Sequence, residues 1–202
     1  MLLRAENLLP PSCARTDFPM SIERHDIAAH RGTSAGQYSK FDFARRILWA
    51  LVGPLFRCSP RHLYGWRNCM LRLFGAKIGR AVRIFPSVRI FAPWMLEVGD
   101  EVTLSWNVTV FNVAPILIGD RSIISQNAHL CAGNHDFRKP ELPFRNRPIH
   151  IESDSWVCSD AFVGPGITLG RLCVVGARAV VTKDVPSRAV LAGNPAKQVA
   201  ER

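Results

Sequence analysis

One histidine in this chain stands where it could take part in acid–base chemistry. His135 belongs to the run 133–136 (GNHD) and directly precedes a stretch rich in Pro, Arg and Asn. An ordinary imidazole titrates at about pH 6.5, so its neutral form is plentiful at pH 7 and can accept a proton. The alternative interpretation is a surface histidine at the start of a loop, without a catalytic role.

The elements that must position this histidine follow a six-residue rhythm. Aliphatic residues recur at Ile151, Val157, Val163, Leu169, Val175 and Val181. Small or apolar residues usually follow four places later, at Ala161, Ile167, Cys173, Ala179 and Val185. Neither a helix of period 3.6 nor an alternating strand of period 2 spaces residues in this way. The rhythm predicts a solenoid, in which only the stacking of repeats buries a core.

The same rhythm extends upstream with breaks. Its members there are Ile78, Ile84, Ile90, Val98, Leu104, Val110, Ile118, Ile124 and Leu130. Two-residue slips near Leu96 and Ile116 can be absorbed at corners, whereas residues 136–148 (DFRKPELPFRNRP) predict a loop extruded from one corner. With three sides to a turn, residues 78–186 predict roughly five to six coils at the strand spacing of a sheet.

These repeats resemble the hexapeptide-repeat acyltransferases, and most closely the maltose/galactoside and colanic-acid type of sugar O-acetyltransferase. The stretches that carry the resemblance are 107–110 (NVTV), 130–136 (LCAGNHD), 162–170 (FVGPGITLG), 181–186 (VTKDVP) and 192–197 (AGNPAK). The resemblance implies a mainly β fold with a small α-helical N-terminal region. Its main domain would be a left-handed parallel β-helix of hexapeptide repeats over 78–190, followed by a C-terminal tail at 191–202.

For the catalytic centre the resemblance implies two residues, His135 and Asn107, and two neighbouring residues are further candidates. His135 corresponds to the catalytic base of the family. Asn107 corresponds to an amide on the acceptor or oxyanion side, which could donate to the charge of a tetrahedral state. Asp136 is expected to bind an acceptor hydroxyl or to hold the imidazole, and Trp106 to stack on a sugar ring. The alternatives are an Asn that makes local bonds in a coil turn and a Trp that only packs.

The resemblance also implies a donor and an assembly. In the family, acetyl-CoA is the donor, and coenzyme A lies in a groove between neighbouring subunits of a homotrimer. The pantetheine side is expected to be lined by Trp156, Ser159 and Ala177. The nucleotide end is expected to be lined by Thr182, Lys183 and Lys197, since a lysine offers a compact charge to phosphate.

The segment 41–77 is both basic and apolar. It has one acid, Asp42, against seven cations: Arg45, Arg46, Arg57, Arg61, Arg67, Arg72 and Lys77. Its apolar run 47–56 is too short to cross a bilayer and is interrupted by Gly53-Pro54. We therefore expect one or two basic amphipathic helices, roughly 42–52 and 61–74.

Two interpretations of this segment are compatible with each other. In one it caps the open end of the coils, with its arginines simply facing water. In the other it makes a peripheral membrane contact, in which Trp49, Leu51 and Phe56 enter the interface beside anionic lipid. No recognisable nucleic-acid-binding module accompanies the charge, so nucleic acid is not an expected partner.

The remaining features set the context. Residues 1–40 are polar without an apolar period, which predicts a disordered extension. The six cysteines include no CxxC pair, and the spacing of His129 and His135 does not match a three-histidine zinc site. We therefore expect no metal, and a cytoplasmic setting, at the inner face of the membrane if the basic segment binds lipid.

Together these features imply transfer of an acetyl group from acetyl-CoA to a hydroxyl of a saccharide, in exopolysaccharide or surface-glycan biosynthesis. Two alternatives stay open. One is an acyltransferase that acts on an amino sugar or an antibiotic, and the other is a β-helix that serves as a non-catalytic scaffold.

Overall fold

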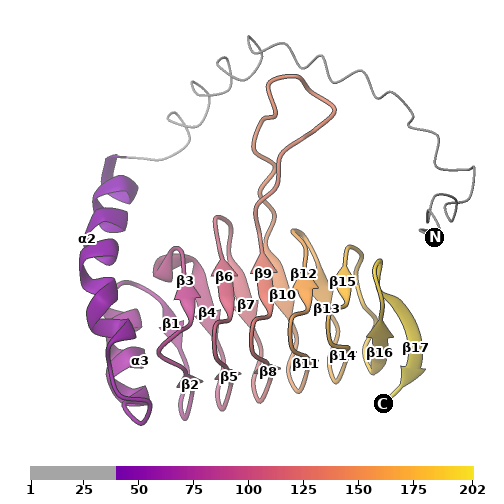
Figure 1. The fold of residues 1–202 in the computed structure, drawn as a ribbon, viewed down its shortest axis with the longest axis horizontal. Coiled ribbons are helices and arrows are strands. Elements are labelled where there is room, and N and C mark those ends of the chain that lie inside the picture. The colour runs from indigo at the N-terminus through magenta and orange to yellow at the C-terminus, as the bar shows by residue number, and fades with distance from the viewer. Residues whose placement is uncertain (1–39) are drawn as a thin grey trace, which may run out of the picture.

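The computed structural model describes residues 40–202, so the expected disordered extension falls outside the described residues except for Lys40. The chain forms a parallel β-solenoid with two helices at its N-terminal end (Figure 1). Each coil contributes one short strand to each of three sheets. The mainly β solenoid predicted from the six-residue rhythm is therefore confirmed.

The three sheets, named here A, B and C, form the sides of the prism. Sheet A contains β1 (Lys77–Ile78), β4 (Leu96–Val98), β7 (Ile116–Ile118), β10 (Ile149–Ile151) and β13 (Thr168–Leu169). Sheet B contains β2 (Arg83–Ile84), β5 (Thr103–Leu104), β8 (Ile123–Ile124), β11 (Trp156–Val157), β14 (Val174–Val175), β16 (Ala189–Ala192) and β17 (Lys197–Glu201). Sheet C contains β3 (Arg89–Ile90), β6 (Thr109–Phe111), β9 (His129–Cys131), β12 (Phe162–Val163) and β15 (Val180–Val181).

The register of sheet A shows how the coils absorb insertions. Ile78 pairs with Val98 and Val98 with Ile118, so these coils are two residues longer than three hexads. A short 3-10 turn at Pro93–Met95 lies at the first of these slips. Ile118 then pairs with Ile151, and the excess in that coil is an arm that rises from the prism between β9 and β10 (Figure 1).

Two helices cover the N-terminal end: α2 (Lys40–Arg57) and α3 (Tyr64–Leu73). The first is longer than the expected 42–52, because it continues through Gly53-Pro54 until Phe56 is buried at 2% exposure. The second begins three residues later than the expected 61–74. No helix within residues 40–202 is long and apolar enough to cross a membrane.

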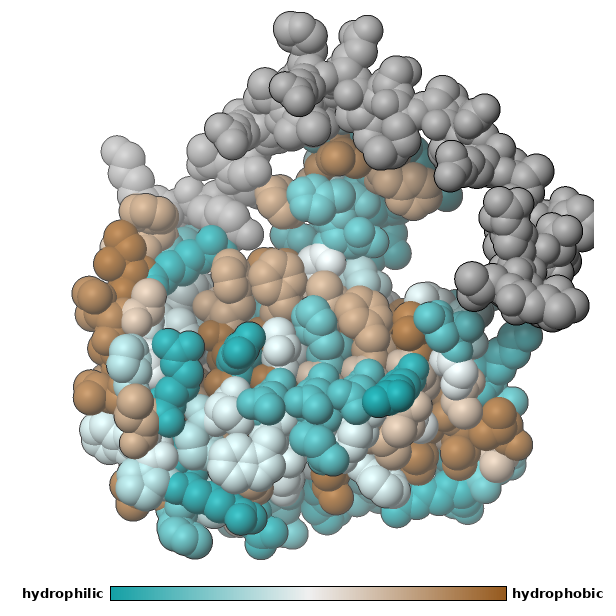
Figure 2. All heavy atoms as spheres, in the orientation of Figure 1, coloured by the Kyte–Doolittle hydropathy of each residue, from teal (hydrophilic) through white to brown (hydrophobic). Residues whose placement is uncertain are grey.

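The orientation of α2 is opposite to the prediction that its arginines face water. Trp49 donates its indole N–H to the carbonyl of Ile90 at 2.9 Å, so Trp49 and Phe56 face the prism, and the expectation that they enter a membrane is wrong. Arg45 lies over the ring of Trp94 at 4.3 Å, so its charge is also turned inward. The outer side of α2 is apolar (Figure 2).

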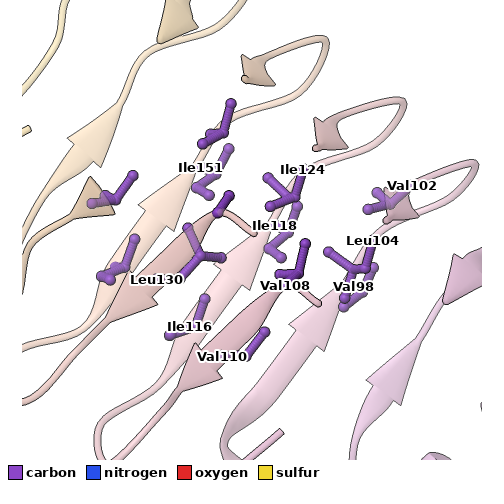
Figure 3. Packing of buried hydrophobic residues seen from close by; sticks show 14 of the residues in the cluster. Val98, Val102, Leu104, Val108, Val110, Ile116, Ile118, Ile124, Leu130 and Ile151 are labelled. Carbon is purple, nitrogen blue, oxygen red and sulfur yellow. The ribbon is translucent and has the colours of Figure 1, made fainter. Parts of the chain in front are cut away.

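The core runs along the inside of the prism. Leu104, Ile124, Leu130, Val157 and Leu169 are fully buried, and each occupies the aliphatic position of its hexad. Figure 3 shows residues from successive coils lying against one another in the interior. At the C-terminal end β17 folds back antiparallel on β16, so the expected tail is a hairpin that closes sheet B.

Candidate active site

His135 lies in the stem of the arm. Its backbone forms an antiparallel bridge with Phe144, and Arg145 donates its N–H to the carbonyl of Asn134 at 2.7 Å. At the root, a Cβ at Gly133 would come within 2.9 Å of the Phe111 ring and closer still to Val113, so only glycine fits there. The stem therefore fixes the position of His135, although the arm projects away from the prism.

The imidazole of His135 is held in one tautomer. Its Nδ1 lies 2.6 Å from the carbonyl oxygen of Leu142, and its ring packs on Phe144 with centroids 4.4 Å apart. A carbonyl oxygen can only accept a hydrogen bond, so Nδ1 carries the proton. Nε2 is then the unprotonated nitrogen of the neutral ring, as a general base requires.

Leu142 supplies that carbonyl from an unusual conformation. Its φ is 45°, a left-handed value that is rare for a bulky residue. The turn that contains it is closed by a bond from the Leu142 N–H to the carbonyl of Lys139 at 3.0 Å. Sequence reasoning missed Leu142 and Phe144, because a backbone carbonyl and a packing ring leave no motif in a loop.

Asp136 does not hold the imidazole. Its Oδ1 accepts from the N–H of Arg138 at 3.2 Å, and its own N–H donates to the carbonyl of Pro143 at 2.9 Å. Asp136 thus shapes the arm one residue from His135. Its role in binding an acceptor hydroxyl stays a prediction.

Four other predicted residues lie on one edge of the prism, the B–C edge, where each coil turns from sheet B to sheet C. Trp106 and Asn107 form this corner between β5 and β6, Ser159 lies between β11 and β12, and Ala177 between β14 and β15. Bonds run from coil to coil along the edge: the N–H of Asn127 donates to the carbonyl of Trp106, and Arg178 N–H donates to the carbonyl of Ser159.

Asn107 also has a structural reason for its identity. Its φ is 56°, and the equivalent corner residues Asn127, Asp160 and Arg178 have the same left-handed conformation. Asn and Asp adopt this conformation more readily than most residues. The backbone N–H of Asn107 donates to the hydroxyl oxygen of Ser87 at 2.9 Å, and the side chain of Asn107 is exposed at the corner.

The other predicted residues lie elsewhere. Thr182 and Lys183 follow β15 on the C–A edge, where each coil turns from sheet C to sheet A; the arm with His135 leaves the same edge two coils earlier. Trp156 stands on the outside of β11 and donates its indole N–H to the hydroxyl of Ser125 at 2.9 Å. Lys197 is exposed at the start of β17.

Most of the predicted site residues are therefore divided between two edges of sheet C, whereas Trp156 and Lys197 lie on sheet B. A side of six residues at about 3.3 Å each separates these edges by roughly 20 Å. Within residues 40–202 no hydrogen bond joins His135 to Asn107, Ser159 or Ala177. One prism alone does not bring the two halves of the predicted site together.

A groove that was not predicted from the sequence lies on the outer face of sheet C. It has a volume of about 470 Å³ and runs between α2 and the outer side of β3 and β6. Trp49, Phe91 and Phe111 line it together with the side chains of Arg46, Arg57 and Arg89. Phe111 also lies close to the root of the arm, since a Cβ added at Gly133 would come within 2.9 Å of its ring.

The other histidines and the cysteines have structural surroundings. Burial lowers the pKa of His129, which packs edge-on against Phe162 in sheet C. Burial raises the pKa of the Cys158 and Cys173 thiols, which favours their neutral form. No group of three His, Cys, Asp or Glu residues that could hold a metal ion is found in the part of the chain described here.

The comparisons with known proteins agree with this architecture. A scan against models of protein families gives no match. The chain is 43% identical over 157 residues to the colanic acid biosynthesis acetyltransferase WcaF of Escherichia coli K12, covering 78% of this chain and 86% of that protein. It is 28% identical over 139 residues to the galactoside O-acetyltransferase of the same organism, covering 67% of this chain and 68% of that protein.

Among solved structures, a galactoside acetyltransferase in complex with coenzyme A superposes with a TM-score of 0.74 at 25% identity. The match covers 82% of this chain and 84% of that one. A six-residue repeat, a histidine-bearing arm and an extended match to WcaF lead to one conclusion: the chain belongs to the hexapeptide-repeat sugar O-acetyltransferase family.

Proposed function

We propose that the protein transfers the acetyl group of acetyl-CoA to a hydroxyl of a saccharide, in the biosynthesis of an exopolysaccharide or surface glycan. The observation that carries the proposal is the tautomer of His135, which presents an unprotonated Nε2 from the stem of the arm. The names of the relatives support the acceptor class, and the coenzyme A complex of a structural neighbour supports the donor.

The reaction needs no covalent intermediate on the protein, because the thioester is already activated. His135 Nε2 takes the proton of the acceptor hydroxyl while its oxygen attacks the acetyl carbonyl carbon. Asn107 or backbone N–H groups stabilise the oxyanion of the tetrahedral state. The carbon–sulfur bond then breaks, and the coenzyme A thiolate leaves and takes up the proton.

The division of the site between two edges supports a homotrimer with shared sites. In a cyclic trimer the C–A edge of one subunit, with His135, Thr182 and Lys183, faces the B–C edge of the next, with Asn107, Ser159 and Ala177. Coenzyme A would lie between them, with Trp156 beside the groove and Lys197 near the phosphates. Such an enzyme works in the cytoplasm, where its donor is made.

The experiment is thiol release from acetyl-CoA with a panel of saccharides, followed by mass spectrometry of the products. Acetyl esters on a saccharide would support the proposal. Acetyl amides on amino sugars, or acetylated antibiotics with unmodified saccharides, would replace it with the corresponding alternative. Failure to bind acetyl-CoA at millimolar concentration would leave a scaffold role and contradict the enzyme.

A further inference from the structure

The outer surface of the helical cap is apolar in a way that the fold does not require. On α2 the residues Phe43, Ile47, Leu51 and Leu55 are spaced four apart and therefore lie in one stripe. All four are exposed, Leu51 at 71% and Leu55 at 61%. Burying these side chains in the prism would be favourable, yet the helix turns them outward.

The stripe continues onto α3. Trp66 and Leu73 are exposed there, Leu73 at 83%. Trp66 lies next to the end of the α2 stripe, because its indole N–H reaches the carbonyl of Leu55 at 3.5 Å. We call the six residues Phe43, Ile47, Leu51, Leu55, Trp66 and Leu73 the outer plate. Figure 2 shows apolar residues gathered over the outside of α2.

Two arginines in the first half of α2 are held on the opposite side of the helix. Arg45 donates to the carbonyl of Phe74 at 3.2 Å and lies over Trp94, while Arg46 lies 4.6 Å over the ring of Phe91. α2 is thus an amphipathic helix whose polar contacts fix it to the prism and whose apolar stripe is presented outward. An exposed contiguous apolar surface of this kind marks an interaction site.

The charge of this region distinguishes between two possible partners of the outer plate, a second copy of the chain and a lipid surface. From Phe43 to Leu96 the sequence has no acidic residue and ten basic ones. Arg57 ends α2, Arg61 lies in the link to α3 and Arg72 lies in the last turn of α3, and all three are exposed. Two copies stacked plate to plate would bring two cationic surfaces together, which is unfavourable. An anionic lipid bilayer is apolar in its interior and negatively charged at its surface, so it matches both the apolar side chains of the plate and the positive charge around them.

We propose that the outer plate docks the enzyme on an anionic lipid bilayer, with the prism axis perpendicular to the membrane plane. Leu51, Leu55 and Trp66 would enter the boundary between headgroups and acyl chains, while the arginines meet the lipid phosphates. The proposal adds membrane docking to the proposed role in glycan synthesis, and it uses the proposed trimer in one argument only. In a cyclic trimer of parallel prisms, three plates face the same way and bind together.

The test is co-sedimentation of the full-length protein with vesicles of phosphatidylcholine alone or with added phosphatidylglycerol. We expect binding to the anionic vesicles that weakens as salt is raised. The double variant Leu51→Gln/Leu55→Gln should lower the partition coefficient about tenfold or more. Val199→Gln, an exposed apolar residue on β17, is the matched control and should bind like the wild type.

Three results would overturn the proposal. In the first, the wild type stays in solution with anionic vesicles at low salt, and in the second, the double variant binds as well as the wild type. In the third, light scattering would find that the double variant loses the oligomeric state of the wild type, which makes the plate a subunit interface. The assay contains no acetyl-CoA, so its result is independent of whether acetyl transfer is detected.

Discussion

The Nδ1 of His135 and the carbonyl of Leu142 lie 2.6 Å apart across the stem of the arm. This contact joins a residue that the sequence singles out to one that it does not. It fixes both the direction of the imidazole and the nitrogen that can accept a proton. In the proposed mechanism the arm is therefore part of the active site, since it holds the proposed base and selects its tautomer.

Leu142 is accordingly a positioning residue, and two substitutions separate its backbone from its side chain. Glycine adopts φ 45° without strain, so Leu142→Gly should retain most of the rate. Proline holds φ near −65° and removes the N–H that bonds to Lys139, so Leu142→Pro should lower kcat about ten- to a hundredfold. The pH–rate profile of Leu142→Pro should also shift, whereas acetyl-CoA binding should not.

A matched pair of neighbours on β8 tests the solenoid core. Ile124 is fully buried and Ile123 is 45% exposed, although they are adjacent in the same strand. Ile124→Ala should lower the free energy of unfolding by about 2–5 kcal/mol, because it leaves a cavity. Ile123→Ala should cost less than about 1 kcal/mol. Equal losses in chemical denaturation would contradict the predicted inward register.

Asp154 should make the fold sensitive to acid. Hydrogen bonds from Arg121, at 2.6 and 3.0 Å, and then from Arg171 lower the pKa of its carboxyl to about 2. The folded pKa lies below the ordinary value of about 3.9, so this pairing stabilises the fold above about pH 4. Its contribution is lost as the pH falls from about 4 to about 2.

The measurement is the Tm as a function of pH for the wild type and Asp154→Asn. The variant should be less stable at pH 7 and should lose less on acidification, so the two curves converge towards pH 2. Asp160→Asn is the control, because its carboxylate lies 4.0 Å from Arg178 in a single loose pair. Parallel curves for the wild type and Asp154→Asn would refute the assignment.

The shared site predicts complementation between inactive subunits. His135→Ala disables the C–A edge, and Ala177→Trp should block the B–C edge by filling the groove. Each variant alone should be inactive. After random reassembly of an equimolar mixture, each mixed trimer keeps one intact site of three, so the whole mixture should regain about a quarter of the wild-type rate. Mixed trimers without activity would place the whole site within one chain.

The fold could be predicted from the sequence because each side of a solenoid coil repeats the same six-residue pattern. Ile151, Val157 and Val163 each mark one side of a coil, so the period alone predicts which side chains face inward. The extent of α2 could not be predicted in this way. Pro54 signals a helix end locally, yet burial of Phe56 against the prism outweighs that signal.

The candidate site could be predicted only as a set of residue types. His135 and Asn107 are visible because their neighbours match a family pattern. Their separation on two edges of sheet C follows from the number of residues in a side, which the sequence does not assign to subunits. Contacts made by backbone atoms, such as the Leu142 carbonyl, depend on a φ value that side-chain identity does not dictate.

The most direct measurement is the turnover of acetyl-CoA with a saccharide acceptor by His135→Ala, together with calorimetric binding of coenzyme A. We predict a loss of about 10²–10⁴ in kcat with unchanged coenzyme A affinity. His150→Ala, an exposed histidine on β10, should behave as the wild type. A His135→Ala enzyme that turns over at the wild-type rate would contradict the assignment of His135 as the base.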